Sequence, residues 1–134
     1  MTINEMTVGQ QASFTKTVTE TDVYLFAGIT GDLNPAHINQ VASEQTMFKG
    51  RIAHGMLVAS LISAVLGTKL PGEGTVYMGQ TLKFRRPVFL GNCITATVEV
   101  AELNPERHIA ILNTTCTNEE GVDVIVGQAT VMLK

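Results

Sequence analysis

The chain has few charged residues, no tryptophan and only two cysteines among its 134 residues. With 16% charged residues and a net charge of −3, it lacks the basic surplus that binds nucleic acid. Cys93 and Cys116 are 23 positions apart with no second cysteine or histidine near either, which excludes a zinc pattern and a disulfide framework. We therefore expect two reduced thiols that pack as small hydrophobic side chains.

Long hydrophobic runs are also missing. The longest, around residues 56–66, is too short to cross a bilayer. The amino terminus has no basic region followed by an apolar one, so we expect no signal peptide. A hydrophobic content of 45% is typical of a folded chain with a well-filled core. We expect one cytoplasmic domain spanning residues 1–134, without a membrane partner.

The first part of the chain carries short elements separated by turns. Alternating residues predict a strand over 12–18. Thr19 or Thr21 can cap a following helix, whose apolar residues repeat at helical spacing and which should end by Gly31. A second, short helix is predicted over 40–46.

A longer helix is predicted from Gly55 to about Lys69, and it carries no charge before Lys69. A helix that is apolar all round is expected to be buried on all sides. Its only polar side chains before Thr68 are Ser60 and Ser63. Each of these hydroxyls can simply bond back to the carbonyl four residues earlier, so neither indicates a site by itself.

The second half of the chain is rich in Val, Ile and Thr and predicts four long strands, over 76–88, 93–103, 108–117 and 124–133. The short connections between them indicate antiparallel pairing. Their alternation indicates one buried and one wetter face, and only the helix from Gly55 can cover the buried face. The predicted fold class is α+β, with a curled antiparallel sheet wrapped around a central hydrophobic helix.

The stretch from Gly31 to Asn39 holds a carboxylate, a proline and an imidazole. Asp32 and His37 are five positions apart, and Pro35 argues against a continuous helix through them. A folded-back loop would let both side chains point at one water, as a proton-transfer pair does. The alternative is a surface turn with a solvated histidine, because Gly-Asp-x-Asn-Pro is good turn chemistry in its own right.

Gly55 begins the apolar helix directly after His54. A helix amino terminus presents unpaired N–H groups, and a residue without a side chain allows a ligand to approach closely. The Gly55 N–H is therefore a candidate donor to a carbonyl oxygen that becomes negative during a reaction. Alternatively, Gly55 permits tight helix–sheet packing and His54 is a structural residue with its hydrogen bonds satisfied.

Lys83, Arg85 and Arg86 form the only basic cluster, which suits either a phosphate-bearing ligand or a solvated strand face. His108 follows Pro105 at a hairpin tip and is expected to be exposed and inert.

These motifs together resemble the R-specific enoyl-CoA hydratases of the MaoC-like, hot-dog-fold group. The short single-domain members from polyhydroxyalkanoate metabolism are the most similar. The resemblance covers essentially the whole chain, and no signature position is substituted. The residues that carry it are Asp32-x-Asn34-Pro35-x-His37, Arg51-Ile-Ala-His54-Gly55-Met56, Gly72-x-Gly74-x-x-Tyr77-x-Gly79-Gln80 and Phe84-x-x-Pro87-Val88.

The resemblance implies reversible syn hydration of a trans-2-enoyl-CoA to an (R)-3-hydroxyacyl-CoA. Asp32 and His37 would hold the water, with Asp32 the favoured base, and the Gly55 N–H would stabilise the thioester oxygen. No metal or cofactor is implied, since the coenzyme A thioester is itself the substrate. Supporting residues in the active site would be Asn34, His54 and Ser63.

The resemblance also implies an acyl pocket, for which Leu66 and Val131 are candidates, and Arg85 is a candidate for the coenzyme A phosphate. Members of the group act as homodimers, with two sheets joined edge to edge and each site near the interface. Such pairing would also protect an exposed strand edge.

Two other functions remain open from the sequence. An acyl-CoA thioesterase on the same fold would direct water at the thioester carbonyl. Many such enzymes place an acidic residue on the central helix, and this helix has none between Gly55 and Thr68. A non-catalytic acyl-CoA-binding module would not need the Asp32–His37 pair.

Overall fold

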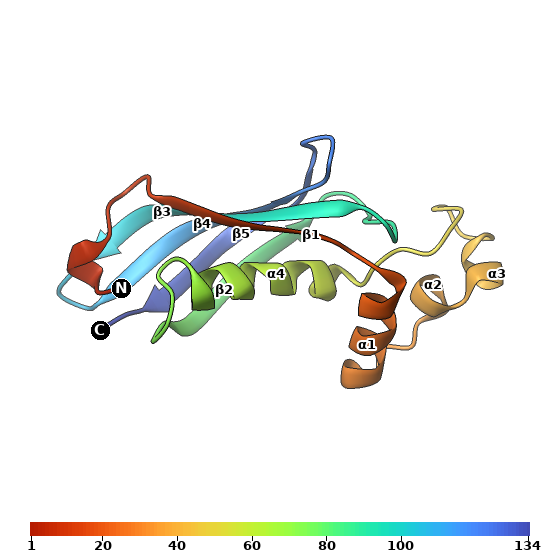
Figure 1. Cartoon of the computed structure of the whole chain (residues 1–134), viewed down its shortest axis with the longest axis horizontal. Coiled ribbons are helices and arrows are strands. Elements are labelled where there is room, and N and C mark those ends of the chain that lie inside the picture. Colours follow the sequence, from red (N-terminus) through yellow and green to blue (C-terminus); the bar gives the residue numbers. More distant parts are fainter.

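The computed structural model describes all 134 residues and contains one antiparallel sheet with the strand order β1-β3-β4-β5-β2. Figure 1 shows this sheet curved over a single long helix, α4 (Gly55–Thr68), which confirms the predicted α+β arrangement. The predicted strands are present with ends shifted by at most one residue, except that the strand predicted over 76–88 ends early, at Phe84. Their bounds are Gln11–Thr17 for β1, Val76–Phe84 for β2, Cys93–Asn104 for β3, Ile109–Thr117 for β4 and Asp123–Met132 for β5.

Helix α1 (Glu20–Thr30) begins and ends where its sequence predicts. The Thr19 hydroxyl accepts a hydrogen bond from the backbone N–H of Asp22, and the Asp22 carboxylate accepts one from the backbone N–H of Thr19. This reciprocal capping satisfies two donors that the first helical turn leaves unpaired. Gly31 follows with φ +81°, a left-handed conformation that ends the helix at low cost for glycine.

Two one-turn helices, α2 (Pro35–Ile38) and α3 (Gln40–Ser43), follow α1. Pro35 interrupts helical structure as predicted, but it also begins α2, because a first helical residue needs no N–H. The Asn34 side chain caps α2 by accepting from the backbone N–H of Ala36 at 3.0 Å. The expected helix over 40–46 is shorter than predicted and ends at Ser43.

Helix α4 lies against the concave face of the sheet with one side only. Val58, Ile62 and Val65 are at most 1% exposed and belong to the main hydrophobic core. On the other side, Met56 is 57% exposed, and Ser63 is exposed as well. The expectation of burial on all sides is therefore wrong for the single chain, because the sheet covers the face that carries Val58, Ile62 and Val65 and leaves the face with Met56 and Ser63 open.

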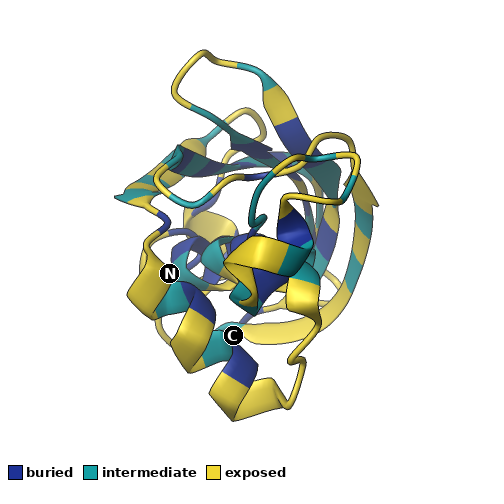
Figure 2. Cartoon of the chain, turned by 90° about the vertical axis from the view of Figure 1, so that its right-hand side faces the viewer, coloured by how far each residue is buried: buried dark blue, intermediate teal, exposed yellow.

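Helices α1, α2 and α3 lie beyond the amino-terminal end of α4, outside the curve of the sheet (Figure 1). In Figure 2, which looks at this end of the molecule, the helical surface nearest the viewer is mostly exposed. Only Val23 and Ala27 of α1 are buried, and they lie on one helical face. This end of the molecule therefore contributes little to the main core.

A short 3₁₀ turn, η1 (Ile3–Glu5), precedes β1 and places Ile3 in the core. Both cysteines are free thiols, and burial raises the pKa of Cys116 to about 12. None of the helices has the length and apolar character needed to span a membrane.

Candidate active site

The loop between α1 and α2 holds Asp32 through hydrogen bonds to residues two positions away along the chain. The Asp32 backbone N–H donates to the Thr30 hydroxyl at 3.1 Å, and the Asp32 Oδ1 atom accepts from the Asn34 backbone N–H at 3.2 Å. Asp32 is exposed, so its carboxylate is accessible to a ligand. Asn34 then caps α2, and the single turn of α2 carries His37 back toward the same place.

His37 is only 8% exposed and has one fixed hydrogen bond. Its Nδ1 atom lies 2.6 Å from the backbone carbonyl oxygen of Ile52. A carbonyl oxygen only accepts, so Nδ1 carries the hydrogen, and in the neutral imidazole Nε2 keeps its lone pair. His37 can therefore accept a hydrogen bond or a proton at Nε2 while its ring orientation is fixed at Nδ1.

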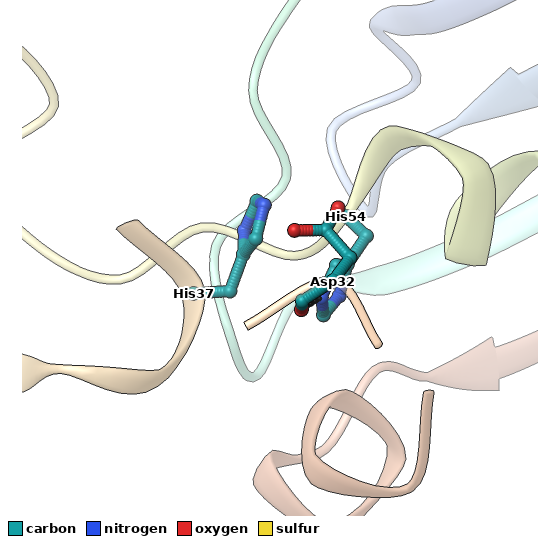
Figure 3. Close-up of side chains that lie close together, drawn as sticks. All are labelled: Asp32, His37 and His54. Atoms are coloured by element: carbon teal, nitrogen blue, oxygen red, sulfur yellow. Dashed lines mark hydrogen bonds between the residues drawn. The ribbon is translucent and has the colours of Figure 1, made fainter. Parts of the chain in front are cut away.

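His54 is 2% exposed and contacts the backbone of the loop that carries Asp32. Its Nε2 atom is 3.0 Å from the backbone carbonyl oxygen of Asp32, so this nitrogen carries the hydrogen. The imidazole also stacks on that of His37, with ring centroids 4.0 Å apart and planes inclined by 31°. Figure 3 shows Asp32, His37 and His54 gathered in one place, from the loop, from α2 and from the residue before α4.

Asp32, His37 and His54 offer ligand atoms that all lie within 4.8 Å of one another. Two imidazoles and a carboxylate form a donor set that a divalent transition metal can use. Asp32 and His37 alone can hold a water molecule and move its protons.

A cavity of about 410 Å³ opens over these residues. It joins the loop, the residues before α4 and the end of β2 in one space, and half of its lining residues are hydrophobic. Such a mixed lining suits a ligand with an apolar part and a polar reacting group. The lining residues are Asp32, His37, Phe48, Ile52, Ala53, His54, Gly55, Met56, Phe84 and Pro87.

Gly55 lies in this cavity as the first residue of α4. Its N–H has no acceptor within the helix, as expected for a first helical residue. A Cβ atom at this position would lie 2.7 Å from Cε1 of Phe84, which is too close. The close packing that the sequence left as one alternative is therefore present. The Gly55 N–H is nevertheless still available as a donor, because it is an unpaired N–H at the amino terminus of α4.

The segment 51–55 is tied to the neighbouring helices by Arg51. The guanidinium donates to the Glu20 carboxylate at 3.1 Å, to the Tyr24 hydroxyl at 3.1 Å and to Oε1 of Gln40 at 2.9 Å. The hydrogen bond with Glu20 raises the pKa of Arg51. Arg51 therefore connects α1, α3 and the residues before α4. The sequence gives no signal for these contacts, because the partners are far apart along the chain.

Ser63 lies apart from this cluster. It lines a second cavity of about 360 Å³ with Tyr77 and Gln80, between α4 and β2. The Ser60 hydroxyl donates to the Leu57 carbonyl, so the local explanation holds for Ser60, although the acceptor is three residues back. No such bond is formed by Ser63, whose hydroxyl has no partner in the chain.

The predicted acyl-pocket and phosphate residues also lie away from the cluster. Leu66 is 1% exposed and Val131 is fully buried, and both belong to the main core. Neither lines the 410 Å³ cavity. Arg85 is exposed just past the end of β2, beside Asp123 and Arg86.

Two aromatic residues belong to the site but were not identified as site residues from the sequence. Phe84 packs on Gly55, and the Phe26 ring lies against His54 with centroids 4.8 Å apart. From the sequence, Phe26 is only one of the apolar positions of α1. Phe84 is predicted to lie in a strand, without a role in the site. Their roles depend on tertiary packing, which periodicity does not report.

Comparison with known proteins gives one family and several close relatives. Residues 4–122 match the family described as MaoC like domain. An (R)-specific enoyl-CoA hydratase from Rhodospirillum rubrum is 55% identical over 125 residues, which are 93% of this chain and 86% of that protein.

Two solved structures are similar over nearly the whole chain. The R-hydratase PhaJ1 from Pseudomonas aeruginosa has a TM-score of 0.94 and 44% identity, with 98% of this chain and 84% of that chain covered. The (R)-hydratase from Aeromonas caviae involved in PHA biosynthesis has a TM-score of 0.94 and 41% identity, with 97% and 98% covered. These similarities confirm the predicted hot-dog fold.

Proposed function

This chain belongs to the family of MaoC-like domains, and we propose that it is an (R)-specific enoyl-CoA hydratase. It is a hydro-lyase that adds water reversibly to a trans-2-enoyl-CoA and gives an (R)-3-hydroxyacyl-CoA. The main support from the structure is the convergence of Asp32 and His37 on one cavity at the amino terminus of α4.

In the proposed mechanism one water lies between Asp32 and His37. His37 accepts a hydrogen bond from this water at Nε2, the nitrogen that the Ile52 carbonyl leaves free. Asp32 removes the other proton as the oxygen attacks C3. Asp32 then delivers that proton to C2 on the same face, so that the addition is syn and the carboxylate is regenerated.

The Gly55 N–H would donate to the thioester oxygen, on which negative charge develops when C3 is attacked. The open position at the start of α4 and the dipole of that helix both support this role. A donor of this kind contributes about 2.7–4 kcal/mol to stabilisation of the transition state. The reaction as proposed uses water and the thioester only, with no metal or cofactor.

Supporting roles are proposed for three polar residues. Asn34 orients Asp32 through its backbone N–H and caps α2 through its side chain. His54 positions the loop by donating a hydrogen bond to the Asp32 backbone carbonyl. Ser63, with its free hydroxyl in the neighbouring cavity, would contact the bound acyl thioester or the water around it.

The remaining binding assignments stay predictions. Leu66 lies one helical turn beyond Ser63, so it could form the end of an acyl pocket together with Val131 if the core opens at this point. Arg85, exposed near the end of β2, is proposed to contact a coenzyme A phosphate.

We also propose that the enzyme is a homodimer joined along β2. This strand is an edge of the sheet, and Val76, Tyr77 and Met78 on it are 55%, 41% and 52% exposed. The exposed Met56 of α4 lines the 360 Å³ cavity together with Tyr77 and Gln80 of β2. Unprotected apolar edges of this kind are usually paired or covered.

A cytoplasmic location and a role in supplying polyhydroxyalkanoate synthesis are expected for this chain. The Aeromonas caviae hydratase is described as involved in PHA biosynthesis. The same product, an (R)-3-hydroxyacyl-CoA, would be the monomer that such a pathway consumes.

The proposal is tested by mixing the purified protein with crotonyl-CoA and following the loss of enoyl-thioester absorbance. Chiral analysis of the product should give the R form. A panel of substrates from four to about twelve carbons then reports the acyl pocket, because each lost methylene contact is worth about 0.8 kcal/mol. Absence of turnover at every chain length would refute the proposal.

Two controls separate the alternatives. Release of free thiol, measured with a thiol reagent, would identify a thioesterase. Tight binding of crotonyl-CoA without hydration or thiol release would identify a binding module. Activity should be the same with and without EDTA, because the mechanism includes no metal.

A further inference from the structure

We infer that His54 is a positioning residue for the hydration reaction, which holds Asp32 through its backbone and His37 through its ring. The inference rests on the proposed function. It goes beyond that function in assigning one specific atom, the Nε2–H of His54, as the contact that determines where the catalytic loop lies.

The first observation is the hydrogen bond from His54 to Asp32. The donor is a side chain 2% exposed, and the acceptor is the main-chain carbonyl of the residue that carries the proposed base. The Asp32 carboxylate takes no part in this contact, and its hydrogen bond in the chain is the one that Oδ1 accepts from the Asn34 backbone N–H. A contact to the backbone therefore fixes the position of Asp32 without using its reactive oxygens.

The second observation is the contact of the His54 ring with two other rings. His37 lies at a centroid distance of 4.0 Å, and Phe26 lies at 4.8 Å with its plane inclined by 53°. The contact with Phe26 supports His54 from α1, and the contact with His37 limits the movement of that ring. The ring of His37 is thus held at its face by His54 and at its edge by the Ile52 carbonyl.

The third observation excludes direct proton transfer by His54. Its Nε2–H is used by the Asp32 carbonyl, and its Nδ1 atom is buried and has no hydrogen-bond partner. With the hydrogen on Nε2, Nδ1 carries only a lone pair. His54 has no accessible proton to give to a substrate, so its effect on the reaction must pass through the two neighbouring residues.

The two histidines therefore have opposite tautomers, each fixed by a backbone carbonyl of the other segment. The carbonyl of Ile52 fixes His37 as the Nδ1–H form, and His54, two residues later, is fixed as the Nε2–H form by Asp32. The loop and the segment before α4 thus each donate one hydrogen bond to the other. This reciprocal pair gives the histidine at position 54 a role, whereas Ile52 contributes only its backbone carbonyl.

The experiment compares two amide variants of different reach, His54→Gln and His54→Asn. The Gln amide places an N–H near the position of the imidazole Nε2, whereas the Asn amide is too short and reaches only the Nδ1 position. We expect His54→Asn to lower kcat roughly 10- to 100-fold, as a displacement of about 1 Å does. His54→Gln should retain at least several times more activity than His54→Asn.

His54→Phe keeps a ring for stacking but has no donor, and it should also lower kcat. For all three variants we expect KM for crotonyl-CoA, and the affinity for the non-reacting butyryl-CoA, to change less than about threefold. Thermal unfolding identifies any variant that fails to fold, and the conclusion then rests on the others. Equal kcat for the Asn and Gln variants, or wild-type kcat for the Phe variant, would overturn the inference.

A spectroscopic measurement tests the tautomers without activity. In the wild-type protein labelled with ¹⁵N-histidine, nitrogen shifts should show His54 protonated at Nε2 and His37 at Nδ1, with His54→Gln and His37→Gln used for assignment. The same tautomer at both positions would contradict the inference. A wild-type protein without hydratase activity would instead refute the proposed function. The nitrogen shifts would still show whether the two histidines have the expected tautomers.

Discussion

The two sides of the molecule that meet at α4 are held together by different interactions. Under the sheet, the core is almost entirely apolar, and Thr114 is its one buried polar side chain. At the amino-terminal end, the other three buried polar side chains, His37, Ser43 and His54, lie within 20 residues of one another. Apolar burial is not directional, whereas hydrogen bonds fix position. The difference indicates that the sheet provides stability and the helical end provides geometry.

The largest effect should follow from Asp32→Asn. The amide cannot take a proton from water but has nearly the same shape, so kcat should fall roughly 10²–10⁴-fold while the unfolding temperature changes little. Crotonyl-CoA hydration and thermal unfolding measure the two quantities. The matched control is Asp22→Asn, which removes the ion pair with Lys16 at 2.7 Å outside the cavity and should leave kcat unchanged. Full turnover in Asp32→Asn would reject its role as base.

The opposite result is expected for Leu112→Ala under the sheet. Leu112 is fully buried on β4, so its truncation should lower the free energy of unfolding by about 2–5 kcal/mol. Urea denaturation measures this loss, and kcat per folded molecule should stay near the wild-type value. Ile29→Ala, at a position 82% exposed on α1, is the control and should change neither quantity. A large loss of kcat in folded Leu112→Ala would show that the two regions are coupled.

Gly55→Ala tests the boundary between the two regions, since Gly55 belongs to both the cavity and the packing of Phe84. The added methyl would lie 2.7 Å from the Phe84 ring and displace it, which should lower kcat/KM roughly 10- to 100-fold. Phe84→Ala removes the clash, so the double variant should recover activity relative to Gly55→Ala. If the double variant stays as slow as Gly55→Ala, the substrate itself needs the space at Gly55.

The smallest effect concerns Cys116, a titratable group under the sheet. Burial raises the pKa of this thiol from 9.0 to about 12, so the folded state keeps a proton that the unfolded state releases near pH 9. Its contribution to stability is complete below that pH and is lost as pH rises toward 12. By pH 9.5 the loss should be about 0.8 kcal/mol. Cys116→Ala should have a flatter alkaline stability profile than Cys93→Ala, as measured by urea denaturation.

Most of the fold follows from local sequence patterns. Thr19 and Gly31 mark the ends of α1 because capping needs only neighbouring residues. Alternation likewise predicts the strands to within a few residues. The exception is α4, where apolar composition alone does not indicate how much of the circumference the sheet covers. Met56 therefore remains exposed in the single chain.

The site was predicted only in part. The loop sequence left open whether Asp32 and His37 share a site or belong to a surface turn, the family resemblance favoured the shared site, and the structure brings the two residues together. The His37–His54 stack and the bond from His54 to the Asp32 carbonyl could not be predicted, because they join side chains and backbone from separate segments. Sequence pattern also cannot distinguish a pocket residue from a core residue, since both are simply apolar, and Leu66, a candidate for the acyl pocket, lies in the main core.

The order of strands in the sheet has a consequence for how the chain acquires its structure. The pairings of β3 with β4 and of β4 with β5 join neighbours along the chain, whereas β1 pairs with β3 through Gln11 and Glu99. Closing that long loop costs more entropy, so we expect the three-strand meander to form first and β1 to join late. The residues of the proposed site lie inside this loop. A chain emerging from the ribosome therefore makes its catalytic segment early but organises it only after its last strands have folded.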